Sequence, residues 1–160
     1  MFSITDKSFC GFRKILDTGT DEKFIHEYCC QQFVTHKLIK ENPEGAAAVT
    51  RALQKASAFV EAEPVEAARL QIENNLISGD LEFNSHLLDE LNFIPSRSLG
   101  KHTFDKAARQ LQQAGILKPE TDIDKFIENG YVELPGVPDG YLYNSQTAEY
   151  IELSEPQASL

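Results

Sequence analysis

The stretch that decides the fold runs from Glu27 to Pro64: it opens with EYCC at 27–30, continues through KENP at 40–43 and ends in VEAEP at 60–64. Pro43 and Glu44 suit a first helical turn, because proline lacks an N–H that this turn leaves unpaired and a carboxylate complements the helix dipole. After them apolar residues recur at spacings of three and four, at Ala46, Val49, Leu53, Ala56 and Val60. This spacing predicts one long helix with that stripe toward the core, ended by Pro64.

Helical patterns also flank this segment. The sequence predicts a short helix over His36–Glu41, a helix from Pro64 to Asn74, and later helices over Leu81–Leu91, His102–Ala114 and Asp122–Asn129. The inward residues of the two leucine-rich patterns are Leu81, Leu87, Leu88 and Leu91, and then Phe104, Ala107, Ala108 and Leu111. We expect Leu53, Ala56 and Phe59 to share a core with Phe104 and Leu111.

Two strands are predicted near the start of the chain, over Gly11–Asp17 and Glu27–Thr35. Two strands are marginal as a sheet, and unpaired strand edges recruit other strands. The sequence therefore predicts a homodimer, or larger aggregates, formed through Met1–Thr35. Residues 135–160 show no period and are expected to be a partly ordered tail.

The composition excludes several kinds of partner. The chain has 160 residues, one domain's worth, and a formal net charge of −10. An acidic chain is a poor match for nucleic acid or an anionic membrane surface. No apolar run is long enough to cross a bilayer, so membrane insertion is not expected. Residues 1–10 form an extra segment without a signal-peptide pattern, so the chain as written is expected in the cytoplasm.

Few residues suggest chemistry. The four histidines fall at no metal-binding spacing, no nucleophile has a recognisable base, and no glycine-rich phosphate loop is present, so neither catalysis, a metal nor a cofactor is expected. Cys29 and Cys30 would point to opposite faces of a strand, which favours two reduced packing residues over a redox pair.

The turn at Asp17, Thr18, Gly19 and Thr20 is the better candidate for a binding site. A strand that ends in hydroxyls and a glycine exposes donors at a sheet edge where α/β folds bind ligands. A polar turn with internal Asx-type bonding is the alternative. These four residues, together with Tyr28, are the candidate ligand-binding residues.

Several segments together carry a resemblance to a family: ILDTGT at 15–20, EYCC at 27–30, KLIKENP at 37–43, AAVTRALQKA at 47–56 and GILKP at 115–119. Over residues 11–134 the chain resembles the nitrate/sulfonate/taurine-type solute-binding proteins of ABC importers, whose relatives include thiamine-precursor proteins. The resemblance implies an α/β, helix-dominated fold, part of one lobe of a type II periplasmic-binding-protein fold with two N-terminal strands and about five helices.

In function the resemblance implies a truncated substrate-binding component of an importer for a small organic or anionic solute, with that solute and an ABC permease as partners. A full-length family member would be periplasmic or otherwise extracytoplasmic. Because a cleft with one wall cannot close on a solute, we expect this chain to bind solutes poorly. The alternatives are a stand-alone helical interaction module or a non-functional remnant, followed by an enzyme of the thiamine-precursor type.

Overall fold

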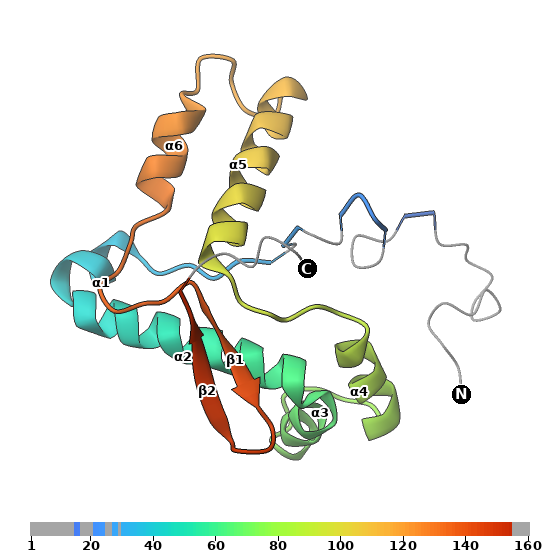
Figure 1. Ribbon diagram of the computed structural model, residues 1–160. Helices are drawn as coiled ribbons and strands as arrows, with labels where there is room; N and C mark the ends of the chain where they lie inside the picture. Colours follow the sequence, from blue (N-terminus) through green and yellow to red (C-terminus); the bar gives the residue numbers. More distant parts are fainter. Residues whose placement is uncertain (1–14, 17–20, 25–26, 29, 155–160) are drawn as a thin grey trace.

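The computed structural model describes residues 15–16, 21–24, 27–28 and 30–154. Within these residues the chain forms six helices and one antiparallel sheet of two strands (Figure 1). The elements are α1 (His36–Glu41), α2 (Pro43–Ala62), α3 (Pro64–Glu73), α4 (Leu81–Asp89), α5 (Arg97–Gln113), α6 (Ile123–Gly130), β1 (Gly140–Asn144) and β2 (Glu149–Leu153). The predicted helix-dominated fold is confirmed, but its β-structure lies elsewhere.

The first three helices begin where the sequence predicts. Thr35 caps α1 by accepting a hydrogen bond from Leu38 N–H at 3.1 Å. Asn42 caps α2 in the same way, accepting from Gly45 N–H at 2.8 Å. Pro43 and Pro64 stand in the first turns of α2 and α3, where a missing N–H costs no intrahelical bond.

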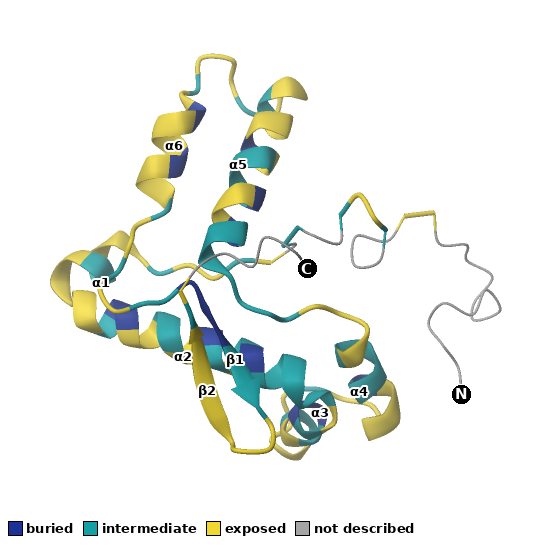
Figure 2. Ribbon diagram, viewed as in Figure 1, coloured by how far each residue is buried: buried dark blue, intermediate teal, exposed yellow. Residues whose placement is uncertain are grey.

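The buried face of α2 is not the predicted one. Its buried residues are Ala46, Ala47, Gln54 and Ala58, whereas Val49 and Leu53 are 45% and 38% exposed and Ala56 is exposed too. The reason is the β1–β2 hairpin, which packs along the other side of α2 (Figures 1 and 2). Small side chains on that side let the hairpin come close. The prediction for the stripe is therefore wrong at Val49, Leu53 and Ala56.

Helices α3 and α4 pack against each other beyond the end of α2 (Figure 1). Asp80 caps α4 by accepting from Phe83 N–H at 2.8 Å, and the buried Asn84 side chain donates to the Asp80 carbonyl at 2.9 Å. Leu81 and Leu91, both predicted to face inward, are 38% and 49% exposed. The Asn84 side chain therefore anchors α4 to the turn that precedes it. Because Asn84 is polar, the apolar periodicity of the sequence gives no sign of this contact.

Helices α5 and α6 run side by side and stand away from α2 (Figure 1). Their shared core contains Ala108, Ile123 and Ile127, with Phe104 and Leu117 packed against it. The expected common core of α2 and α5 is wrong. Two contacts and one exposed side chain show this. Phe104 stacks on Phe126 at 5.4 Å between ring centroids, Phe59 of α2 meets Tyr143 of β1 at 5.3 Å, and Leu111 is 40% exposed.

The hairpin of β1 and β2 occupies the segment expected to be a partly ordered tail. Tyr141 pairs with Glu152 and Leu142 with Ile151 across the two strands. Tyr141 is only 2% exposed, the lowest fraction for any large side chain among the described residues. Residues 140–153 therefore form an ordered hairpin that covers one side of α2 with hydrophobic contacts.

The predicted strand over Glu27–Thr35 is wrong at every residue of it that the structure describes, 27–28 and 30–35, since none has strand structure. Its polar groups bond to α5 instead: Tyr28 N–H donates to Thr103 Oγ1 at 3.3 Å and Gln31 Nε2 donates to the Gly100 carbonyl at 2.9 Å. Of the other predicted strand, Gly11–Asp17, only residues 15 and 16 are described, and they have no regular structure. The described residues of the two predicted segments therefore contain no strand through which a dimer could form.

Candidate functional site

The N-terminus of α5 is fixed by a buried carboxylate. Asp139, 6% exposed, accepts from Ser96 Oγ at 2.7 Å and from Ser98 N–H at 2.8 Å. Its backbone carbonyl accepts from Arg97 N–H at 2.8 Å and from Gln54 Nε2 at 3.1 Å. A negative group at a helix N-terminus also complements the helix dipole. Asp139 therefore links α2, α5 and the hairpin at one point. Its hydrogen bonds fix the position and orientation of the first turn of α5.

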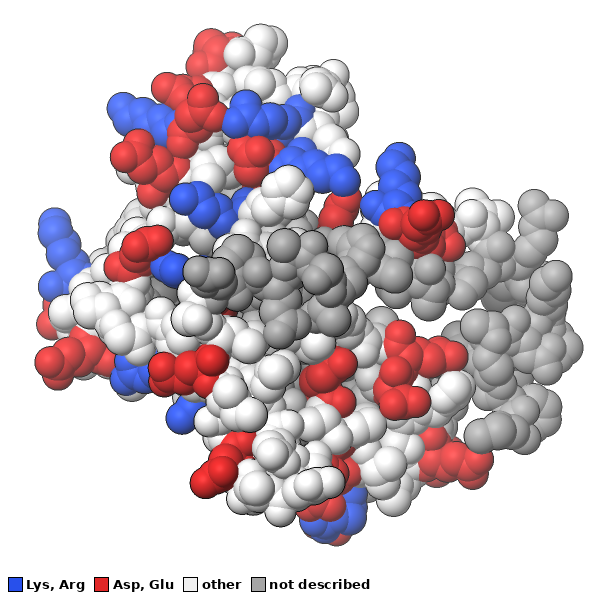
Figure 3. Space-filling model, in the orientation of Figure 1, with Lys and Arg blue, Asp and Glu red and all other residues white. Residues whose placement is uncertain are grey.

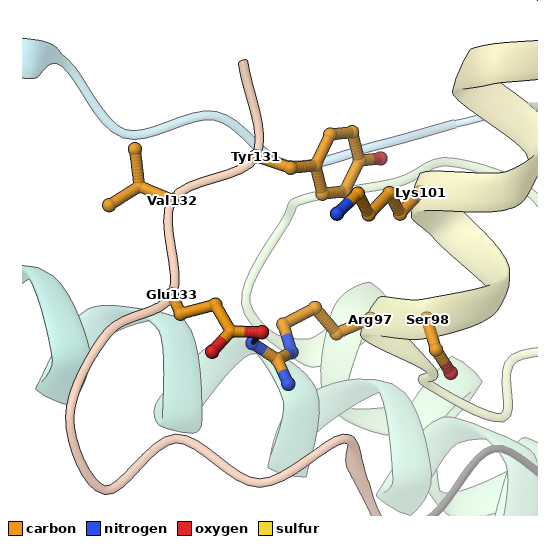
Figure 4. A pocket seen from close by; sticks show the side chains of 6 residues that line it. All are labelled: Arg97, Ser98, Lys101, Tyr131, Val132 and Glu133. Carbon is orange, nitrogen blue, oxygen red and sulfur yellow. Dashed lines mark ion pairs between the residues drawn. The ribbon is translucent and has the colours of Figure 1, made fainter. Parts of the chain in front are cut away.

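A hollow of about 240 Å³ opens beside this first turn of α5. One wall comes from α5 and the other from the segment that follows α6 (Figure 4). The lining residues are Arg97, Ser98 and Lys101 from the helix, and Tyr131, Val132 and Glu133 from the segment. Arg97 and Lys101 are one helical turn apart, so both side chains lie on the same side of α5.

The hollow is locally cationic in an acidic molecule. Residues 97–134 contain six basic and six acidic residues, so the net charge of −10 arises outside this range. Figure 3 shows several Lys and Arg side chains over α5 and α6 on the visible face, interspersed with Asp and Glu. Arg97 Nη1 lies 3.2 Å from Glu133 Oε1, but the Glu133 side chain is 85% exposed. Within the described residues, Lys101 has no carboxylate at ion-pair distance.

Tyr131 forms the apolar side of the hollow and is held by two neighbours. Its hydroxyl donates to Gln31 Oε1, while the other end of the same amide donates to Gly100 on α5. Its ring lies 5.5 Å from that of Phe104. Burial raises the pKa of Tyr131, against a smaller opposing effect of the Gln31 hydrogen bond. The phenol is therefore a neutral, fixed wall at physiological pH.

Of the predicted ligand-binding residues, Asp17, Thr18, Gly19 and Thr20 lie outside the described residues. Tyr28 is described and packs on α5 beside Gly100, behind the hollow. Its hydroxyl donates to the Ile94 carbonyl, and burial, followed by the charge of Asp139, raises its pKa to about 12. The predicted pair Cys29–Cys30 is described only at Cys30, which is exposed.

The sequence prediction missed Arg97 and Lys101 because it began the helix at His102, five residues late, and it missed Glu133 because no local pattern links the segment after α6 to α5. A signal for the true start was present: Ser96 follows a proline, and serine is a preferred N-cap residue. Its hydroxyl accepts from Leu99 N–H at 3.2 Å in the structure. With the helix started at Arg97, the spacing of Arg97 and Lys101 would have placed both on one face.

Comparison of the chain with protein-family models, with curated proteins and with solved structures found no significant match. Among the described residues, no helix is both long and apolar enough to pass through a bilayer. The same residues contain no group of three or more histidine, cysteine or carboxylate side chains placed to hold a metal ion.

The side chains that line the hollow offer positive charge and hydrogen-bond donors beside an aromatic wall.

Proposed function

We propose that the chain is a module of a solute-binding protein for an ABC importer of a small organic or anionic solute, and that it acts by binding rather than by catalysis. The sequence resemblance over residues 11–134 suggests this family. The start of α2 at Pro43 and the turn at Gly115, which has φ of +73°, lie in two of the segments that carry the resemblance. Assignment to a type II lobe is part of the proposal.

One observation carries the idea that this module works against a partner surface. The central residues of the apolar stripe on α2, which were predicted to face the core, are uncovered in the described part of the chain. Val49 and Leu53 are 45% and 38% exposed, and the alanines beside them, Ala52 and Ala56, are exposed as well. An amphipathic helix gains stability by burying its apolar face, so an uncovered stripe favours packing against further protein. In the proposal, that protein is the remainder of the two-lobed clamp.

Calorimetric titration tests the proposal. The chain is titrated with nitrate, taurine, an alkanesulfonate and a pyrimidine precursor. We expect no micromolar binding, because a small solute is held by closure of two lobes and not by one. A micromolar isotherm for any of these solutes would contradict the proposal that a partner surface completes the site.

A stand-alone helical interaction module is the second candidate, and the same uncovered stripe on α2 favours it. The two candidates differ in what should lie beside the coding sequence. A solute-binding component predicts neighbouring genes for a permease and an ATPase, or an in-frame first lobe. An interaction module predicts neither, so sequencing the flanking DNA separates them.

A further inference from the structure

We infer that the hollow between α5 and residues 131–133 binds a small organic oxyanion, a carboxylate or sulfonate head group, between Arg97 and Lys101. This inference rests on the proposed function for the class of solute, but its site is new and is drawn from the geometry alone. Both cations project from one side of α5 into a space of about 240 Å³, which accommodates a small head group (Figure 4).

The charges in the hollow are not balanced by the protein itself. Lys101 has no acidic partner among the described residues, and Arg97 is paired only with Glu133, whose side chain is 85% exposed. Exposed ion pairs are weak, so a ligand oxyanion can replace the Glu133 carboxylate at low cost. Arg97 Nε is buried, and within the described residues it donates no hydrogen bond. The planar guanidinium of Arg97 suits the bidentate geometry of a carboxylate or sulfonate.

The backbone at the start of α5 is not the binding element. Ser98 N–H already donates to Asp139, and Arg97 N–H donates to the Asp139 carbonyl. The Asp139 carboxylate is also occupied by Ser96 and Ser98, which leaves the side chains of Arg97 and Lys101 to meet the ligand. The aromatic wall at Tyr131 lies beside them and gives the organic part of the ligand an apolar contact.

The inference is tested by following backbone amide NMR signals of the chain during titration with methanesulfonate and with acetate. Dimethyl sulfone, which has the same shape as methanesulfonate but no charge, is the neutral control. We expect saturable shifts from both anions at concentrations on the order of millimolar, a weaker affinity than the micromolar binding that the calorimetric test excludes. The shifts should be confined to residues 97–101 and 131–133, and the sulfone should cause none. A response to only one of the two anions identifies which head group the hollow accepts.

Three variants make the result specific. Lys101→Gln should weaken anion binding at least about tenfold, because it removes a charge-assisted hydrogen bond and about 1.4 kcal/mol corresponds to a factor of ten in affinity. Lys118→Gln makes the same charge change in the loop at the other end of α5 and should leave binding unchanged. Glu133→Gln should strengthen binding roughly twofold to fivefold by removing the competing carboxylate. Loss of folding cannot mimic that gain.

The inference is overturned if the shifts spread over lysines throughout the chain, if Lys118→Gln weakens binding as much as Lys101→Gln, or if Glu133→Gln does not strengthen it. Its failure is distinguishable from failure of the proposed function. Micromolar binding of any of the four solutes to the original chain would contradict the proposed function, whereas the localised shifts and their response to Lys101→Gln decide whether the hollow holds an anion.

Discussion

Among single residues, Asp139 joins the most parts of the molecule. Asp139→Ala removes the acceptors of Ser96 Oγ and Ser98 N–H and leaves these donors without their partner. We expect a loss of about 1–3 kcal/mol in the free energy of unfolding, measured by urea denaturation. Asp89→Ala, at an exposed position at the end of α4, is the control and should change stability by less than about 0.5 kcal/mol. Equal losses in both variants would show that Asp139 has no special role.

Tyr28 should make the free energy of unfolding decrease at alkaline pH. Its pKa is raised from an ordinary value of 10.0 to about 12, chiefly by burial. The folded state therefore holds the phenol proton more tightly than the unfolded state. That contribution to stability is complete below about pH 10 and is lost as the pH rises from about 10 to about 12. Urea denaturation at about pH 8 and about pH 11 should show a smaller decrease for Tyr28→Phe than for the original chain. An identical decrease would mean that Tyr28 titrates normally.

Among the elements, α2 has a buried side and an uncovered side, and only the buried side should lose stability when alanine is replaced by leucine. Ala58 is 2% exposed, so Ala58→Leu should overfill the packing and cost about 1–3 kcal/mol. Ala52→Leu, on the exposed side, should change stability by less than about 0.5 kcal/mol. Leu53→Ala should likewise cost less than about 1.5 kcal/mol, because Leu53 is 38% exposed. A loss above about 2 kcal/mol at Leu53 would restore the face that the sequence predicted.

The close packing of the hairpin against the backbone at Pro95 depends on Gly140. A Cβ atom added there would overlap the carbonyl oxygen of Pro95, which is backbone and cannot move aside easily. We expect Gly140→Ala to displace β1 and to cost about 1–3 kcal/mol. Gly130→Ala at the end of α6 is the matched change: its Cβ would meet Phe104 at an ordinary 3.7 Å, so stability should change by less than about 0.5 kcal/mol. Similar effects at both glycines would argue against the close approach at Pro95.

The sequence predicted helices well and strands badly, for physical reasons visible at particular residues. Helix starts at His36, Pro43 and Pro64 depend on local capping and on proline, which are legible in the chain. The hairpin was missed because its strands pair with each other and pack on α2, so its stability comes from contacts distant in sequence. The segment 27–35 has β-compatible residues but no neighbouring strand, and its polar groups bond to α5 instead.

The candidate site was harder to predict than the fold. Its cations belong to a helix whose start was placed five residues late, and its opposite wall follows α6 some thirty residues further along the chain. No local pattern joins Lys101 to Tyr131 or Glu133. Only the packing of α5 beside α6 brings them to one hollow, and that packing depends on the small cluster around Ala108, Ile123 and Ile127.

Taken as a whole, the described molecule buries little large apolar surface. Six of its nine buried hydrophobic residues are alanines, while seventeen large hydrophobic residues are exposed. Two of these seventeen, Val49 and Leu53, lie on α2, where with the exposed Ala52 and Ala56 they form one apolar stripe along the helix. The central claim is therefore that the α2 stripe is a contact surface for further protein, in line with the proposed place of this chain in a larger binding protein.

Sedimentation equilibrium over a wide range of protein concentrations tests this claim most directly. The isolated chain should associate with itself as concentration rises, because its uncovered α2 stripe has no other partner in solution. The double variant Val49→Ser/Leu53→Ser should associate clearly less. The control Leu76→Ser/Ile116→Ser removes two other residues, 74% and 70% exposed, and should associate as the original chain does. A chain that stays monomeric at every concentration, or that associates equally in both double variants, would contradict the account.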